Sequence, residues 1–248
     1  MCKILFRGLT LIQIMLFTSN VWALDFKEIL KKADSYRIST SSSKVETEVE
    51  LYKNDKLDKR KKYRVYVKPG RRSLVLFMSA NEQGQKVLML EDNFWIMMPT
   101  SRRAIRITPM QKLIGEASTG DIATMTWSEF YGGEILNADT LYEKTPAIYL
   151  NLKSQVKGTT YENIKLFVSK ESFAPLAADL YVKSGKMAKQ AKYFVKDMGN
   201  REMVFKMVLL DRIQKDRRTE VFFNSIVPFE MPDKYFNPMF LVRNDIQE

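Results

Sequence analysis

The chain has 248 residues and a formal net charge of +11, with no histidine and a single cysteine, Cys2. Ser-His-Asp and Cys-His catalysis is therefore excluded, and a zinc site would lack the ligands that zinc uses most often. The sequence contains neither a Walker loop nor a dinucleotide-binding glycine pattern, so we predict no cofactor and no metal. The excess of positive charge favours anionic partners.

The first 23 residues have the pattern of a cleaved signal peptide. Lys3 and Arg7 precede the apolar run Leu9–Phe17, and Val21-Trp22-Ala23 offers a cleavage site before Leu24. An uncleaved membrane anchor is the alternative, although the apolar run is shorter than the roughly 20 residues that a span needs. We therefore expect an exported protein of the cell envelope.

The exported chain would keep a net charge of +9 and no cysteine. Its 225 residues, 24–248, are enough to bury a large core without disulfides, so we expect a single domain. Cys2 precedes the apolar run, so it cannot be the lipidated cysteine of a bacterial lipoprotein.

The exported part begins with a helix and continues as strands. Asp25 is a candidate cap for a short helix whose apolar face is formed by Phe26, Ile29, Leu30 and Ala33. From Val45 the period becomes two, and the predicted inward side chains are Val45, Thr47, Val49 and Leu51. Asn54-Asp55 is a predicted turn before a returning strand at 61–68.

The next three predicted strands, Ser73–Ser79, Lys86–Glu91 and Phe94–Met98, are apolar on both faces. Each face therefore needs cover from a helix, a second layer or a ligand. Asp92-Asn93 is a predicted tight turn, and Arg102–Ile107 reads as an alternating basic strand.

The strand period is lost between residues 109 and 137. Met110, Leu113 and Ile114 have helical spacing, and Ile122–Tyr131 is a second helical candidate that Gly132-Gly133 ends. We therefore expect two brief helices, forming an insertion at 109–137.

The rest of the chain reads as consecutive hairpins. The predicted strands are 147–154, 163–169, 175–183, 189–198, 201–210 and 217–224. In the first hairpin we expect Ile148, Leu150 and Leu152 to oppose Ile164, Leu166 and Val168. The fold class is thus mostly β with short helices (α+β), with a large curved antiparallel sheet rolled towards a barrel.

Long apolar side chains on these strands and helices are candidates for binding an apolar ligand such as an acyl chain, and an ordinary protein core is the alternative. The candidates are Leu76, Met78, Leu88, Leu90, Trp95, Met97, Leu113, Ile122, Leu150 and Leu166.

Arginines follow two of the turns. Arg71 and Arg72 come after Gly70, whereas Arg102 and Arg106 share one face of their strand. Guanidinium groups suit a lipid head group or an acidic docking partner, and protection of an edge strand is the alternative.

A paired-carboxylate enzyme remains open on residue types alone, because aspartate and glutamate are present. The candidate acids are Glu91, Asp92, Asp121 and Glu129. Acids beside turns are more often solvated or capping, so we expect no enzyme.

Residues 87–107, VLMLEDNFWIMMPTSRRAIRI, resemble the outer-membrane lipoprotein-sorting (LolA-like) superfamily, which has an apolar strand, an acidic turn, an aromatic strand, Pro and a basic strand in this order. Tyr66–Gly70, Gly115–Trp127 and Ile226–Phe236 resemble other segments of that group. The resemblance covers most of the exported chain.

The resemblance implies an incomplete antiparallel barrel with helices lying over a concave apolar cavity, in which case the insertion at 109–137 would be a lid. It also implies a non-enzymatic periplasmic carrier of acylated lipoproteins or lipids. Lys68 matches the position of an arginine that holds the lid closed in this family, and Arg71 or Arg72 could replace it.

Two hypotheses of function follow. The first is a carrier for acyl chains whose basic rim, formed by Lys68, Arg71, Arg72, Arg102 and Arg106, contacts head groups or an anionic membrane surface. The second is an accessory subunit without lipid cargo that docks on an envelope exporter of the inner membrane through this rim. Nucleic acid is not an expected partner of an exported chain.

Overall fold

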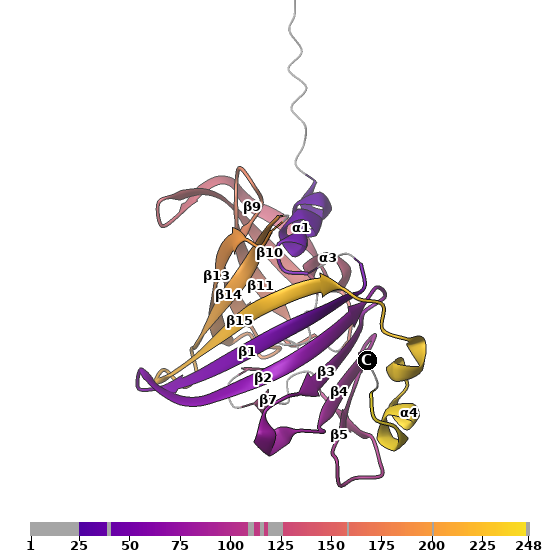
Figure 1. Cartoon of the computed structure of the whole chain (residues 1–248). Coiled ribbons are helices and arrows are strands. Elements are labelled where there is room, and N and C mark those ends of the chain that lie inside the picture. Colours follow the sequence, from indigo (N-terminus) through magenta and orange to yellow (C-terminus); the bar gives the residue numbers. More distant parts are fainter. Residues whose placement is uncertain are drawn as a thin grey trace, which may run out of the picture.

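The computed structural model describes residues 25–38, 41–108, 112–114, 117–118, 126–157, 159–199 and 201–246, so the predicted signal peptide lies outside the described residues (Figure 1). The helical elements are α1 (Phe26–Ser35), η1 (Ala80–Glu82), α3 (Trp127–Phe130), η2 (Asp233–Phe236) and α4 (Pro238–Arg243). The strands of the first half are β1 (Ser43–Lys53), β2 (Lys56–Lys68), β3 (Arg72–Phe77), β4 (Lys86–Leu90), β5 (Asn93–Met97), β6 (Ile105–Ile107), β7 (Lys112–Ile114) and β8 (Ala117–Ser118). Those of the second half are β9 (Tyr131–Tyr142), β10 (Thr145–Ser154), β11 (Asn163–Ser169), β12 (Pro175–Tyr181), β13 (Met187–Asp197), β14 (Glu202–Asp211) and β15 (Arg217–Pro228).

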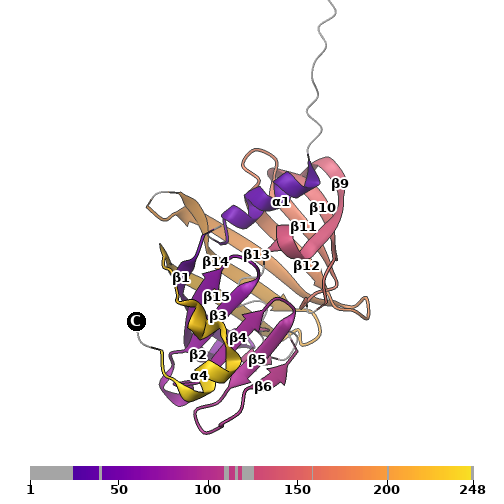
Figure 2. The ribbon, with the colours of Figure 1, turned by 90° about the vertical axis from the view of Figure 1, so that its right-hand side faces the viewer.

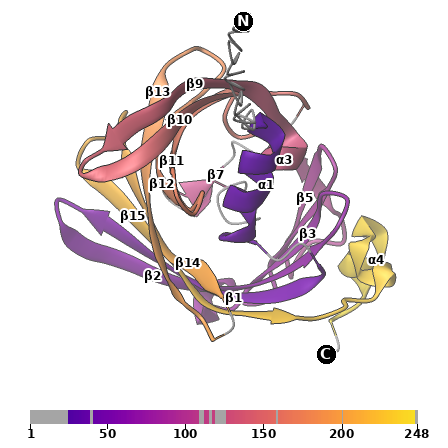
Figure 3. The ribbon, with the colours of Figure 1, turned by 90° about the horizontal axis from the view of Figure 1, so that it is seen from above.

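Thirteen strands form one antiparallel sheet in the order β6-β5-β4-β3-β2-β1-β15-β14-β13-β12-β11-β10-β9. Within each half of the sheet, β1 to β6 and β9 to β15, strands that follow one another in the chain lie side by side. The two halves are joined by pairing of β1 with β15. The sheet curls around α1 (Figure 3), and within the described residues its edge strands β6 and β9 do not pair. The predicted fold class, an incomplete antiparallel barrel with short helices, is confirmed.

Both faces of β3, β4 and β5 are covered, each by a different part of the chain. On the inner face, Val75, Val87 and Phe94 belong to the main core, together with the apolar side of α1. On the outer face, Leu88 and Met97 belong to a second cluster under the C-terminal segment, residues 229–246, which contains η2 and α4 (Figure 2). This arrangement explains why the three strands are apolar on both sides.

The elements predicted from strong periodicity are confirmed. Asp25 caps α1, since its side chain accepts a hydrogen bond from Lys27 N at 3.1 Å. Asn54 and Asp55 have φ angles of 49° and 57°, as a tight hairpin turn requires. Of the side chains predicted to face inwards, Ile29, Leu30, Ala33, Val45, Thr47, Val49 and Leu51 are buried and Phe26 is partly buried.

The register of β10 and β11 is also as predicted. Leu150 lies opposite Leu166, and the flanking pairs are Ile148 with Val168 and Leu152 with Ile164. All six side chains are buried, because alternating apolar residues on both strands allow only one register that keeps them inside.

The structure differs from the predicted helices at 109–137. Lys112–Ile114 pairs with Ala117–Ser118 as a short antiparallel hairpin, and the described helix in this region, α3, has four residues. The apolar run before Gly115 is too short for helical spacing to be distinguished from a strand. Ile122 lies outside the described residues.

Two further boundaries are corrected. A helix, α3, does end just before Gly132-Gly133, but these glycines lie inside β9. Gly133 must be glycine, because a side chain there would collide with the backbone of Asn151 on β10. The basic strand predicted at 102–107 is limited to Ile105–Ile107. In the part of the chain that the structure covers, every helix is too short or too polar to span a bilayer.

Candidate functional site

A cavity of about 200 Å³ lies between α1, α3, β4 and the turn that joins β2 to β3. Its apolar wall is formed by Ile38, Val67, Met89 and Phe130. Its mouth is formed by the partly or fully exposed residues Lys31, Arg71, Arg72, Thr126, Ser128 and Glu129, and the buried residues Asp34 and Lys68 also line it. Pockets for drug-sized ligands are usually about 300–1,000 Å³, so in this state the cavity has room for only part of an acyl chain.

The two helices above the cavity are joined by Asp34 of α1. Its buried carboxylate accepts hydrogen bonds from the backbone N–H groups of Trp127, at 2.8 Å, and Ser128, at 2.7 Å. These groups begin α3 and have no partner within the helix. Thr126, the residue before α3, makes no capping hydrogen bond with its side chain. Asp34 therefore caps α3 from another element.

Arg37 reinforces this contact. Its Nη1 lies 3.4 Å from the Asp34 carboxylate, and its guanidinium lies 3.9 Å from the ring centre of Trp127. Burial nevertheless raises the pKa of Asp34 above its ordinary value, because the loss of hydration outweighs the opposing effects of Arg37 and the two N–H groups. We refer to α1, α3 and these contacts as the helical cover.

Arg71 reaches the helical cover from the turn between β2 and β3. Its φ angle is 57°, in the left-handed region, directly after Gly70 at 77°. The guanidinium donates to Asp92 at 2.7 Å and lies 5.2 Å from the ring centre of Phe130 on α3. Arg71 thus connects the sheet to the helical cover.

Lys68, the predicted latch position, holds a different element. Its ammonium group donates to Asp233 at 2.7 Å and to the Met231 carbonyl at 3.1 Å, and it also pairs with Glu230. Arg72 pairs with the same Asp233 at 3.1 Å. Although Lys68 borders the cavity, its charge binds the C-terminal segment.

The ten predicted ligand-binding residues are not brought together. Leu76, Leu88, Leu90, Trp95 and Met97 lie in the outer cluster under the C-terminal segment. Leu150 and Leu166 lie in the main core, and Met78 is 39% exposed just beyond β3. Leu113 is on β7, where only the backbone is described, and Ile122 is outside the described residues.

The residues that do line the cavity were not among the ten. Met89 and Val67 lie on the inner face of their strands. Their neighbours in sequence, Leu88 and Lys68, lie on the outer face. Strand period assigns residues to two faces but does not say which face is concave. One signal indicates the inner face. Val65 and Val67 lie opposite residues of β1 that the alternating pattern of that strand places inside.

The predicted basic rim is divided in the same way. Arg71 and Arg72 border the cavity, whereas Arg102, Arg103 and Arg106 are exposed and do not. Arg106 donates to Asn93 on the neighbouring strand.

Two of the candidate acids, Asp92 and Glu129, are engaged in other contacts. Asp92 binds Arg71, and Glu129 accepts a hydrogen bond from Thr126 at 3.0 Å. Within the described residues no group of three possible metal ligands is found. Asp121 lies outside the described residues.

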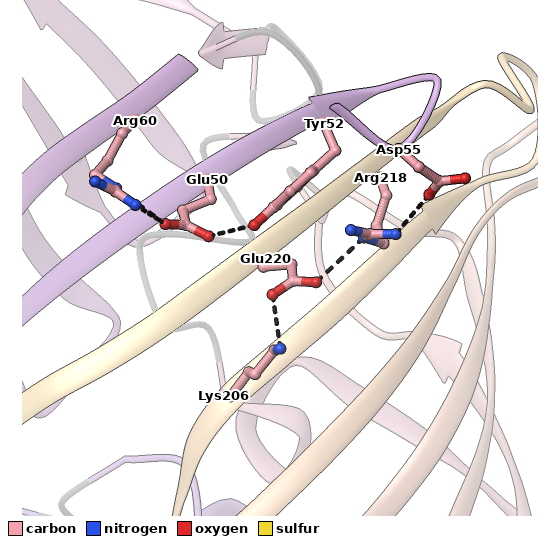
Figure 4. Close-up of polar contacts among 7 residues, drawn as sticks. All are labelled: Glu50, Tyr52, Asp55, Arg60, Lys206, Arg218 and Glu220. Atoms are coloured by element: carbon pink, nitrogen blue, oxygen red, sulfur yellow. Dashed lines mark hydrogen bonds and ion pairs between the residues drawn. The ribbon is translucent and has the colours of Figure 1, made fainter. Parts of the chain in front are cut away.

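Another polar cluster lies on the outer face of β1, β2, β14 and β15 (Figure 4). Glu50 and Glu220 are directly opposite on paired strands, an unfavourable arrangement for like charges. Tyr52 and Arg60 donate to Glu50, while Lys206 and Arg218 pair with Glu220. The hydrogen bonds from Tyr52 and Arg60 lower the pKa of Glu50, so Glu50 is charged, and each of the two acids has a basic neighbour.

A family model described as an uncharacterized protein matches residues 69–243. No curated protein matches the sequence. Among solved structures, a LolA superfamily protein from Nitrosomonas europaea is 25% identical with a TM-score of 0.80, covering 87% of this chain and 98% of that one.

Two more distant structures share the fold. A DUF1329 family protein from Desulfovibrio piger is 19% identical with a TM-score of 0.70, covering 85% of this chain and 95% of that one. An outer membrane lipoprotein-sorting protein domain from Vibrio parahaemolyticus is 17% identical with a TM-score of 0.69, covering 88% and 98%.

Proposed function

The chain has the LolA-like fold and belongs to the family whose model matches residues 69–243, and on that premise we propose that it is a non-enzymatic carrier of acyl chains in the cell envelope. The cargo is a lipid or an acylated lipoprotein, and transfer is directed towards the outer membrane. The predicted signal peptide supports an address in the periplasm.

The observation that carries this proposal is the apolar cavity beneath the helical cover. Its cover is not part of the sheet: α3 has only four residues and is held from α1 and the sheet by Asp34, Arg37 and Arg71. Separation of α3 from α1 would enlarge the cavity without breaking a strand pair.

Energetics favour such an opening when cargo is present. Each buried methylene contributes about 0.8 kcal/mol, so an acyl chain of about ten carbons supplies about 8 kcal/mol, which can offset the loss of two or three hydrogen bonds to charged groups. The carrier would therefore be closed when empty and open when loaded.

Binding of a fluorescent fatty acid tests the proposal, together with native mass spectrometry of the protein purified from its own envelope. We expect bound lipid in the gently purified protein and competitive uptake of the probe. Protein that is empty under gentle conditions and takes up neither free lipid nor an acylated lipoprotein would contradict a carrier role.

The accessory-subunit hypothesis is supported by one observation. Arg102, Arg103 and Arg106 are exposed and lie outside the cavity, so their charge is directed to the surroundings. This hypothesis predicts salt-sensitive capture of an inner-membrane exporter, which Arg102→Glu or Arg106→Glu would abolish, with no uptake of lipid.

A further inference from the structure

We propose that the cavity selects amphiphiles with an anionic head group, a phosphate or a carboxylate, and that Arg71 binds this anion. The inference rests on the proposed function and adds the chemical class of the cargo's head group. It is carried by the position of Arg71, by its unused donors, and by the division of the cavity into a charged mouth and an apolar wall.

The position of Arg71 is fixed by an uncommon backbone conformation. A residue other than glycine rarely has a backbone φ angle near 57°, yet Arg71 has this angle at the mouth of the cavity. Asp92 holds its Nη1 at 2.7 Å, and the ring of Phe130 lies 5.2 Å from the guanidinium. Its side chain is only 23% exposed, so a ligand there would be partly shielded from water.

The guanidinium has capacity for a second anion. It carries five N–H donors, and among the described residues its Nε and Nη2 have no hydrogen-bond partner. These two nitrogens form the planar fork that binds two oxygens of a phosphate or carboxylate. Asp92 orients the group from its other side and leaves that fork available.

Lys31 is a second cation at the mouth. Lys68 and Arg72 also border the cavity, but both are already paired with Asp233, and the two acids on the lining are Asp34 and Glu129. Asp34 is already engaged with α3. Lys31 pairs with Glu28 at an exposed site, where water weakens the pair and a ligand can compete for the ammonium group.

The apolar wall indicates that the anion is attached to a hydrocarbon chain. Val67, Met89 and Phe130 offer no polar side-chain atom to a ligand and lie beside the charged mouth. A head group at Arg71 would place the first part of its chain against these side chains. The volume of about 200 Å³ accommodates that part, and the remainder requires separation of α1 and α3.

Calorimetric titration with matched amphiphiles tests the inference. The probes are dodecyl phosphate and dodecyl maltoside, which share one chain, below their micelle concentrations, with inorganic phosphate as a third ligand. We expect the wild type to prefer dodecyl phosphate to the maltoside by about tenfold or more, given the strength of charge-assisted hydrogen bonds. Arg71→Gln should abolish this preference while binding of the maltoside is kept.

The matched control is Arg103→Gln, which removes the same charge at an exposed site outside the cavity and should leave the preference intact. Thermal melting verifies that each variant is folded. If Arg71→Gln does not fold, Arg71→Lys replaces it and should weaken the preference, since lysine lacks the planar fork.

The outcomes separate this inference from the proposed function. Equal binding of both amphiphiles, or an unchanged preference in the Arg71 variant, overturns the head-group site and leaves the carrier role standing. Inorganic phosphate binding as tightly as dodecyl phosphate identifies a site for free anions and overturns a lipid head group. Absence of binding by either amphiphile to the wild type removes the proposed function itself.

Discussion

The Asp34 carboxylate lies 2.8 Å from the backbone nitrogen of Trp127, so a residue near the start of the described chain caps a helix 93 positions later. This hydrogen bond and its neighbour at Ser128 join α1 to α3 above the cavity. Any change to Asp34 should therefore affect both stability and access to the cavity.

Asp34→Ala should destabilise the fold by roughly 1–3 kcal/mol, the usual cost of leaving buried donors without a partner. It should also speed uptake of a fluorescent fatty acid, because α3 loses its cap. Urea denaturation and stopped-flow fluorescence measure the two effects. Asp139→Ala is the control, since Asp139 forms an exposed pair with Lys170 at 2.9 Å, and an equal effect there would contradict the role of Asp34.

Asp34 should also give stability a specific pH dependence. Burial raises its pKa in the folded state above the ordinary 3.8, so the folded protein binds this proton more tightly than the unfolded chain does. Stability from this group is complete below its unfolded pKa and is lost as pH rises through the folded pKa. Relative to Asp34→Asn, the wild type should therefore lose stability as pH rises from about 4 through that raised pKa.

Urea denaturation of the wild type and of Asp34→Asn across this pH range gives the difference directly. Comparing the two proteins cancels the acids whose pKa is lowered, such as Glu50, which act in the opposite direction. A difference that stays constant with pH would show that Asp34 does not titrate abnormally.

Lys68→Met should release the C-terminal segment and leave the helical cover in place. The substitution keeps an apolar stem but removes the ammonium group that pairs with Glu230 and Asp233. We expect several-fold faster limited proteolysis within residues 229–246 and unchanged fatty-acid uptake. Lys170→Met, at an exposed pair, is the control, and faster uptake in Lys68→Met would instead assign Lys68 the latch role implied by the family resemblance.

Two adjacent residues of β4 test which face binds cargo. Met89 borders the cavity and Leu90 packs under the C-terminal segment, so the same substitution can be made on either side of one strand. Met89→Trp should fill the cavity and weaken fatty-acid binding by about tenfold, whereas Leu90→Trp should not, with up to about 3 kcal/mol of destabilisation from overpacking in each. Binding lost only in Leu90→Trp would place the cargo on the outer face.

Much of the architecture could be predicted because it depends on local pattern. The alternation in β1 identified its buried face, and the apolar runs of β10 and β11 determined their register. The two-sided apolarity of β3, β4 and β5 correctly required two covers, although the outer one proved to be η2 and α4 of this chain rather than a ligand.

The candidate site was less predictable, since it depends on contacts between distant segments. Nothing near Asp34 in the sequence indicates that it caps α3. From its position in a short helix alone, one would expect its side chain to face solvent. The Lys68 partners lie more than 160 residues away in a segment whose path over the sheet is set by packing. Short apolar runs such as 112–114 fit a strand as well as a helix, so local pattern could not assign them.

The ladder between β1 and β15 has a consequence for how the protein forms. Its paired residues, such as Ser43 and Pro228, are separated by about three quarters of the chain, and this ladder lies at the centre of the sheet. Contacts between such remote positions slow folding, because a very long loop must close before they form. Most of the polypeptide must therefore be present before this ladder can form and the two halves of the sheet can join.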